Sequence, residues 1–279
     1  MGKLWGYLAV SALVACGVVG ALLYIRAGNQ ASEPVWSGPG IWIGYSSEAP
    51  YAFRAENGYV TGQSPEIAKA VLEKLGVGPI RWVLLDFGQA IPELLAGRID
   101  MIANGLFITP ERAAKVLFSL PYSRALPALL VRRGNPHDLH SYATAAKKAE
   151  VTVAVLDGSV EQAELTTLGM PPERLFVVPD PMAGLAAVRA GRADCLALTA
   201  PTVAWFARQA PGDVAVAEPF YGAPDAAPGE NAFAFRPADR DLADRVNAAL
   251  RSYIGTPEHE KLVEAFGFGP RSLPDWSRR

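Results

Sequence analysis

Arg112 is the residue whose position most directly suggests binding chemistry. It lies in NGLFITPERAAKVLFSLPY (104–122), where Thr109, Pro110 and Glu111 have the character of an N-cap, a first-turn proline and a first-turn acid. A helix start is therefore predicted here, and the helix dipole gives a cation no advantage in the first turn. An arginine in that position can hold an anion that arrives at the same helix end. The alternative is a solvated surface arginine.

Six further side chains of chemical interest follow segments that are predicted to be strands. Three are aromatic, two are acidic and one is a hydroxyl: Tyr51, Phe87, Phe107, Glu48, Glu161 and Ser159. Ligands bind at the carboxyl ends of strands in open α/β sheets, so these residues and Arg112 are candidates for one binding site. Each aromatic taken alone could instead be ordinary core packing.

Motifs for catalysis and for phosphate binding do not occur in the chain. There is no G-x-S-x-G nucleophile turn, no P-loop and no dinucleotide-binding G-x-G-x-x-G after a strand. The three histidines, His137, His140 and His259, lack metal-ligand spacing and are expected to be solvated. A net charge of −2 and a pI of about 6.0 argue against a nucleic-acid face. We therefore expect a binding protein without a catalytic centre, metal or cofactor.

The N-terminal segment differs sharply in composition from the rest of the chain. Between Lys3 and Arg26 lies the uncharged run LWGYLAVSALVACGVVGALLYI, and roughly 20 apolar residues are enough to span a bilayer. We expect residues 1–30 to be an uncleaved signal-anchor, followed by a linker over 31–40, with the remainder outside the cytoplasm. The tetrapeptide that ends in Cys16 also resembles a lipoprotein lipobox, whose cysteine is lipidated. Both alternatives tether the protein to the cytoplasmic membrane.

From residue 41 onward, strand-like and helix-like segments alternate, which predicts a mostly parallel sheet covered by helices. In the first half, strands are expected at 41–46, 80–85 and 99–105, and helices at 65–76 and 91–98. In the second half, strands are expected at 151–156, 175–179 and 193–199, and helices at 159–169 and 182–192. LLAGRIDMIA and AVRAGRADCLAL have the same local pattern. In each, a helix is predicted to end at a glycine, and the following Arg-x-Asp leads into a predicted strand. This repeat favours two similar α/β lobes.

Two chain crossings are needed if the second lobe is inserted into the first. ALPALLVRR (125–133) is predicted to leave the first lobe, and NAFAFRP (231–237) is predicted to be a strand that returns to it. The expected first lobe comprises 41–126 and 234–279, the second comprises 127–233, and the hinge crossings fall near 123–130 and 230–235. Such a double-stranded hinge leaves a cleft that can close around a ligand.

Several of these motifs together resemble the bacterial extracellular solute-binding proteins of family 3, the polar amino-acid type. The resemblance spans about residues 41–269 and is carried by SPEIAKAVLEKLG, DFGQAIPELLAGRIDMIANG, TPERAAKVLFSLPY and AFAFRPADRDLADRVNAAL. It implies a two-lobed periplasmic-binding-protein-like fold of type II. It also implies delivery of a small solute to an ABC permease in the inner membrane.

Within that family the chain is most similar to ectoine- and hydroxyectoine-binding proteins, through EAPYAF, DFGQAIP, NGLFITPERAA, RRGNPHDLHSY and PPERLFVVPD. The similarity implies a carboxylate-gripping arginine, aromatic walls around a ring, and acids that face cationic nitrogens. In this chain the arginine would be Arg112. The aromatic walls would be Tyr51, Phe87 and Phe107, and the acids would be Glu48 and Glu161. Ser159 stands in a turn that is less glycine-rich than is usual for the group.

Two positions favour a ring-shaped cation over an ordinary amino acid. Amino-acid binders of the family usually carry Ser or Thr where Phe107 stands, and Asp at the end of the strand that here ends in Thr199. Without that acid, a free ammonium would lose a charge-assisted hydrogen bond worth roughly 1.5–3 kcal/mol. A charge delocalised over a ring instead gains about 0.5–2 kcal/mol from each aromatic face. Ectoine, a cyclic amidinium with one carboxylate, fits this pattern, as would proline betaine.

Other functions are also compatible with the sequence. A polar amino acid is the first alternative ligand. Cyclohexadienyl dehydratases share the expected fold and use a pocket carboxylate as an acid–base group, a role that Glu48 or Glu161 could fill. A periplasmic sensor that docks on a membrane partner is a further alternative.

Overall fold

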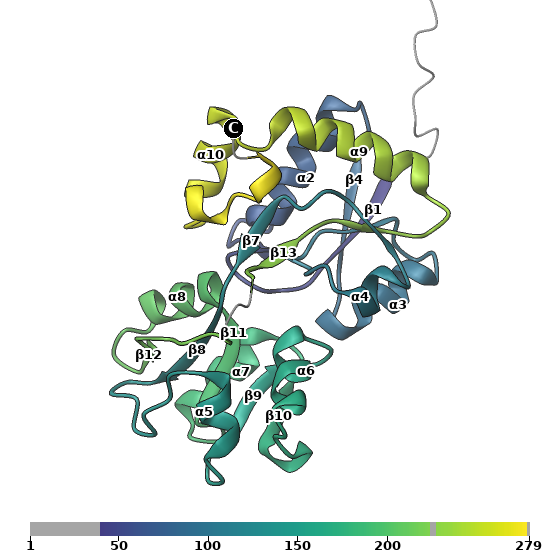
Figure 1. Cartoon of the computed structure of the whole chain (residues 1–279). Helices are drawn as coiled ribbons and strands as arrows, with labels where there is room; N and C mark the ends of the chain where they lie inside the picture. The colour runs from purple at the N-terminus through teal and green to yellow at the C-terminus, as the bar shows by residue number, and fades with distance from the viewer. Residues whose placement is uncertain (1–39, 224–226, 278–279) are drawn as a thin grey trace, which may run out of the picture. The chain divides into compact units, whose positions relative to one another are not determined.

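The computed structural model describes residues 40–223 and 227–277, which form two α/β lobes, each built on a five-stranded sheet (Figure 1). The first sheet has the order β4-β1-β5-β14-β6. Its strands are β1 (Ile41–Tyr45), β4 (Ile80–Leu84), β5 (Met101–Ile102), β6 (Leu117–Phe118) and β14 (Ala234–Phe235). β1 pairs in parallel with β4 and β5, whereas β14 runs antiparallel to β5 and β6. The chain therefore returns to complete the first sheet after it has built the second lobe.

Helices cover this first sheet and close the chain. They are α2 (Gln63–Lys74), α3 (Ala90–Leu95), α4 (Pro110–Ala113), α9 (Arg240–Tyr253) and α10 (Pro257–Glu264). Short 3-10 turns lie at Phe87–Gln89, Pro270–Ser272 and Asp275–Ser277, and a small hairpin joins β2 (Phe53–Arg54) to β3 (Val60–Thr61). α9 buries an apolar stripe that includes Leu242, Val246 and Leu250, and it packs against α2.

The second sheet has the order β10-β9-β11-β8-β12. Its strands are β8 (Pro127–Arg132), β9 (Val153–Leu156), β10 (Leu175–Val178), β11 (Cys195–Thr199) and β12 (Val214–Val216). Its helices are α5 (Tyr142–Lys147), α6 (Val160–Thr167), α7 (Pro181–Arg189) and α8 (Ala200–Gln209), with a 3-10 turn at Pro172–Arg174. Alternate residues of β8 point to opposite faces of the sheet. Leu130 packs into the apolar cluster on one face, and Leu129 packs into the apolar cluster on the other. Because both faces of the sheet are covered, its central strands are apolar at nearly every position.

Two short strands connect the lobes. β7 (Ser123–Ala125) and β13 (Gly229–Asn231) pair antiparallel, with Ser123 opposite Asn231, and they lie between the two sheets in Figure 1. Ser123 Oγ lies 3.0 Å from Asn231 Oδ1 and 3.1 Å from Gln63 Oε1, within hydrogen-bonding distance of both. The connecting pair is therefore anchored to the start of α2.

The repeated Gly-Arg-x-Asp sequence has the same structural role in both lobes. Gly97 and Gly191 lie just past the ends of α3 and α7, with φ angles of 72° and 69° that favour glycine. Asp100 and Asp194 each accept a backbone N–H from the chain at a neighbouring parallel strand, at 3.0 and 2.9 Å. Each acid thus ties an incoming strand to its neighbour, and the repeat serves folding.

Several element boundaries differ from those expected. The strand predicted at 99–105 covers only Met101–Ile102, because the chain turns at Gly105, whose φ is 78°. The crossing predicted over 125–133 falls on two strands, β7 and β8, which are separated at Leu126. β7 pairs with the returning chain and β8 pairs within the second sheet, so the backbone must change direction between them.

The expectation that His259 is solvated was wrong. The side chain is 1% exposed and packs against the Tyr253 ring at a centroid distance of 5.4 Å. Its Nδ1 accepts the backbone N–H of Gly255 at 3.3 Å. Burial disfavours the imidazolium and lowers the pKa of His259 to about 4. The residue occupies the buried face of α10.

The predicted signal-anchor at 1–30 and nearly all of the predicted linker at 31–40 lie outside the described residues. Within residues 40–223 and 227–277, no helix has both the length and the apolar character needed to cross a bilayer.

Candidate functional site

All seven residues predicted for the site line one cavity between the two lobes. The lining side chains are Glu48, Tyr51, Phe87, Phe107, Arg112, Ser159 and Glu161, together with Gly105, Leu156, Val160, Leu198 and Thr199. They follow the carboxyl ends of strands in both sheets or lie at the starts of the helices beyond. This is the edge at which open α/β sheets bind ligands.

The cavity is nearly filled by its own side chains. Its open space is about 20 Å³, which is room for about one water molecule. Small-molecule sites usually enclose some 300–1,000 Å³. In the described conformation the two lobes are therefore in direct contact around the site.

Arg112 is placed by a short helix whose start follows the sequence expectation. Thr109 caps α4, and its Oγ1 accepts the backbone N–H of Arg112 at 3.3 Å. The guanidinium Nη1 donates to Phe107 O at 2.8 Å, and Nη2 donates to Gly158 O at 3.0 Å. Burial lowers the pKa of Arg112, and the nearby Glu161 opposes that shift. Arg112 is thus half-buried and bonded to two carbonyl oxygens, rather than fully solvated.

Glu48 belongs to the loop after β1 and is 6% exposed. Its Oε1 accepts a hydrogen bond from Thr202 Oγ1 of the second lobe at 2.9 Å. The pKa of Glu48 is raised to about 8, chiefly by burial and also by the charge of Glu161, while the hydrogen bond from the Thr202 hydroxyl acts in the opposite direction. Without a cation nearby, the carboxyl is held mainly in its neutral form at neutral pH.

Glu161 lies in the first turn of α6, which Ser159 caps by accepting the N–H of Gln162 at 3.1 Å. Burial raises the pKa of Glu161 to about 7. Its own backbone N–H, Arg112 and the Ser159 hydroxyl each lower that pKa and so limit the shift. The site thus holds one guanidinium and two carboxyls that are poised to ionise if a cation arrives.

The three aromatic side chains surround these charged groups. The Phe87 ring lies under the Arg112 guanidinium, 5.6 Å from its central carbon. Tyr51 is fully buried, and its hydroxyl accepts from Thr199 Oγ1 at 3.1 Å. Phe107 packs so closely on the connecting strand that a Cβ at Gly229 would lie 2.7 Å from its ring. Aromatic faces, a guanidinium and two acids together can hold a small zwitterion.

Three residues at the lobe contact were not predicted as site residues. In the sequence, Thr199 stood out only as the position where amino-acid binders usually carry Asp. A polar side chain at the end of a strand could also have marked it as a site residue. Thr202 lies in the first turn of α8, where no local pattern marks it. Gly88 was also missed: a Cβ there would lie 2.9 Å from Asp157 Oδ2 and 3.2 Å from Asp157 O. Glycine thus leaves room for this close approach of the lobes, which an added Cβ would crowd.

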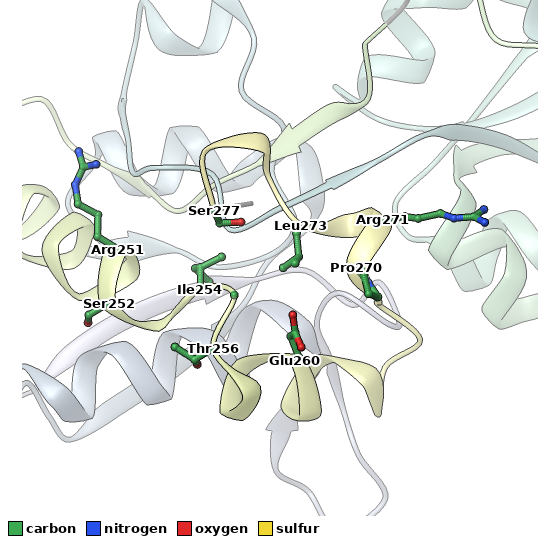
Figure 2. Close-up of a pocket in the computed structure, with 10 residues that line it drawn as sticks. Arg251, Ser252, Ile254, Thr256, Glu260, Pro270, Arg271, Leu273 and Ser277 are labelled. Atoms are coloured by element: carbon green, nitrogen blue, oxygen red, sulfur yellow. The ribbon is translucent and has the colours of Figure 1, made fainter. Parts of the chain in front are cut away.

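A larger cavity, of about 710 Å³, lies on the first lobe between the ends of α9 and α10 and the C-terminal turns (Figure 2). Its lining residues are Arg251, Ser252, Ile254, Gly255, Thr256, Glu260, Pro270, Arg271, Leu273 and Ser277. None of the seven predicted residues is among them, and its lining in the described chain includes no aromatic ring. Over residues 40–223 and 227–277 there is also no cluster of metal-ligating side chains.

Comparison with known proteins gives consistent matches over most of the chain. The family model of bacterial extracellular solute-binding proteins, family 3, matches residues 41–270. The chain is 35% identical over 254 residues to a probable amino-acid ABC transporter periplasmic-binding protein of Sinorhizobium fredii, which covers 88% of this chain and 83% of the relative. It is 29% identical over 161 residues to an octopine-binding periplasmic protein of Rhizobium meliloti, which covers 53% of each.

Solved structures with the same architecture include two binding proteins. EhuB in complex with hydroxyectoine matches with a TM-score of 0.78 and 30% identity, over 86% of this chain and 93% of that one. Holo ArgBP from T. maritima matches with a TM-score of 0.69 and 27% identity, over 82% of this chain and 96% of that one. The two lobes thus form an α/β periplasmic-binding-protein fold of type II.

Proposed function

The chain belongs to the bacterial extracellular solute-binding proteins of family 3, and from that premise we propose that it captures a small zwitterion of the ectoine or hydroxyectoine type for an ABC importer. This is a family of solute-binding proteins and the chain is not an enzyme, so the dehydratase alternative is set aside. The protein acts on the extracytoplasmic side. Its tether through residues 1–30 stays a prediction.

One observation carries the choice of ligand: a guanidinium, two buried carboxyls and three aromatic side chains line the same cavity. A ligand carboxylate can pair with Arg112, whose planar fork suits two-point contact with a carboxylate. A ring with a delocalised positive charge can lie between aromatic faces and draw Glu48 and Glu161 into their ionised forms. The similarity to EhuB, whose structure contains hydroxyectoine, supports the same class of ligand.

Entry of such a ligand requires the lobes to separate. The open space of about 20 Å³ cannot accept a ring, and in the part of the chain that the structure describes the lobes are connected through the strand pair β7 and β13. Rotation about these strands would open the cleft without disturbing either sheet. Closure onto the solute would then bring Gly88 back toward Asp157 and Thr202 back toward Glu48, with the side chains that now fill the cavity displaced to make room for the solute.

A polar amino acid is the second candidate ligand. It is favoured by the names of several relatives, among them the amino-acid-binding protein of Sinorhizobium fredii and the ArgBP structures. Against it, Thr199 supplies a hydroxyl rather than a carboxylate at the end of β11, and this hydroxyl already donates to Tyr51. An α-ammonium would have to pair with Glu48 or Glu161 instead.

The test is calorimetry on protein that has been unfolded and refolded to remove any carried solute. Ectoine, hydroxyectoine, proline betaine and a panel of amino acids would be titrated in turn. We expect micromolar binding, about −8 kcal/mol, for the ectoines alone. Tight binding of an ordinary amino acid would keep the transport role and replace the ligand. No binding across the panel would reject the proposal.

A further inference from the structure

Thr202 makes a contact that joins the two lobes at the site. It lies in the first turn of α8, is fully buried, and donates from Oγ1 to Glu48 Oε1 at 2.9 Å. Glu48 follows β1 in the first lobe, 154 positions away in the sequence. A threonine in a helix often bonds its hydroxyl to the carbonyl one turn back. Here the single hydroxyl proton instead forms a hydrogen bond to a carboxyl on the opposite lobe.

The backbone on the acceptor side is already fixed. Glu48 N–H donates to Ala52 O at 2.7 Å, and Ala52 N–H donates to Glu48 O at 2.9 Å. This small bridge holds the loop after β1, so the freedom that remains at Glu48 lies in its side-chain torsions. The Thr202 hydroxyl supplies the orientation that the loop itself does not.

We propose that Thr202 is a positioning residue of the ligand site, which orients the Glu48 carboxylate toward the cationic part of the bound solute as the lobes close. This inference rests on the proposed function of the same cavity. A hydroxyl donated to a carboxylate bonds more strongly than one donated to a neutral acid. Thr202 therefore favours the ionised carboxylate that a cationic ligand needs.

Other ionisable groups around Glu48 act in different ways. Glu161 of α6 is a like charge, and Tyr51 on the same loop is held neutral by burial. Arg112 of α4 lines the same cavity. A neighbouring hollow that also borders Glu48 is lined by Asp86 and Asp180. Thr202 differs from these groups because it is uncharged and donates a hydrogen bond from the opposite lobe to the Glu48 carboxyl itself.

Thr199 provides a matched control. Like Thr202, it donates a hydrogen bond from the second lobe to the first, but the acceptor is the Tyr51 hydroxyl, at 3.1 Å, and not a carboxyl. Loss of this hydrogen bond should weaken closure, as loss of the Thr202 bond does. It should leave the ionisation of Glu48 unchanged, because Thr199 does not bond to the acid. The two threonines therefore separate a general closing contact from a specific effect on Glu48.

The experiment compares the full chain with its Thr202→Val, Thr202→Ser and Thr199→Val variants. Ectoine affinity would be measured by calorimetry between pH 6 and pH 9. Thr202→Val should weaken binding about tenfold or more and move the pH profile to higher pH. Thr202→Ser should restore both. Thr199→Val should weaken binding without moving the profile. A Thr202→Val profile that keeps the wild-type midpoint would overturn the inference.

A second readout needs no ligand. The Glu48 carboxyl can be titrated by carbon NMR in the ligand-free protein, with Glu48→Gln used for assignment. We expect a higher midpoint in Thr202→Val than in wild type, and no change in Thr199→Val. Equal midpoints overturn the positioning role whichever solute binds. A shifted midpoint in a protein that binds none of the solutes would reject the proposed function and leave the role of Thr202 standing.

Discussion

Arg112 and Gly158 join the lobes directly, because the Arg112 Nη2 donates to the Gly158 carbonyl oxygen at 3.0 Å. Arg112 belongs to α4 of the first lobe, and Gly158 to the turn between β9 and α6 of the second. The other terminal nitrogen donates to Phe107 O. A guanidinium carries five N–H donors, so donors are left for a ligand carboxylate. The same side chain can thus bind the solute carboxylate and hydrogen-bond to the opposite lobe.

Replacing Arg112 with alanine should abolish solute binding, because the charge and the planar fork are both removed. Arg112→Lys keeps the charge but not the fork, and we expect at least about tenfold weaker binding. Calorimetry with ectoine measures both. Without its two hydrogen bonds to carbonyl oxygens, the ligand-free Arg112→Ala protein should melt only about 2–4 °C below wild type. A much larger fall, with binding retained, would assign Arg112 a purely structural role.

The two buried acids predict that the closed form depends on pH. The pKa of Glu48 is raised to about 8 and that of Glu161 to about 7, both chiefly by burial. A group whose pKa is raised by closure stabilises the closed form below its ordinary pKa, and that contribution is lost as pH rises through 7 and 8. Small-angle scattering should therefore show a larger radius of gyration for ligand-free protein at pH 9 than at pH 5.

The control for this pH effect is Glu48→Gln, which removes the higher of the two titrations. Its radius of gyration should increase less over the same range, and the remaining change should be centred near pH 7. A wild-type radius that is equal at both pH values would show that ionisation of these acids does not open the lobes.

Gly88→Ala tests the close approach of the lobes. The added Cβ would lie 2.9 Å from Asp157 Oδ2 and 3.2 Å from Asp157 O, so closure is obstructed. We expect several-fold weaker ectoine binding and no loss of ligand-free stability, because Ala restricts the unfolded chain more than Gly does. Gly212→Ala is the matched control, since a Cβ there meets nothing within 4 Å. Equal affinities for the two variants would contradict the proposed closure.

Phe87→Leu tests the aromatic wall while keeping apolar bulk. Phe87 lies 5.6 Å from the Arg112 central carbon and also lines the cavity. Loss of one aromatic face should cost a cationic ring about 0.5–2 kcal/mol, or between about two- and thirtyfold in affinity. Calorimetry would compare ectoine with an amino acid that has no delocalised charge. An equal loss for both would indicate that Phe87 supplies bulk and not a cation-binding face.

The two α/β lobes and the side chains that line one cavity are predictable from the sequence, because both depend on local signals. The turn after each strand is marked by glycine, proline or a helix cap, as Thr109 and Pro110 mark the start of α4. Residues at such turns come together whenever parallel strands share a sheet. The true length of β5 and the break at Leu126 were not predictable, because strand pairing partners determine where each strand ends.

The sequence by itself determined the order of elements, the family and which charged and aromatic side chains stand at the ends of strands. Only the tertiary structure decided which side chains on the opposite lobe these residues contact. Thr202 faces Glu48 and Thr199 faces Tyr51 across 154 and 148 positions of sequence, and Gly88 meets Asp157. The physical reason is that helix and strand periods describe only one element at a time. Contacts between lobes depend instead on how two separately folded sheets are brought together, for which no local pattern exists.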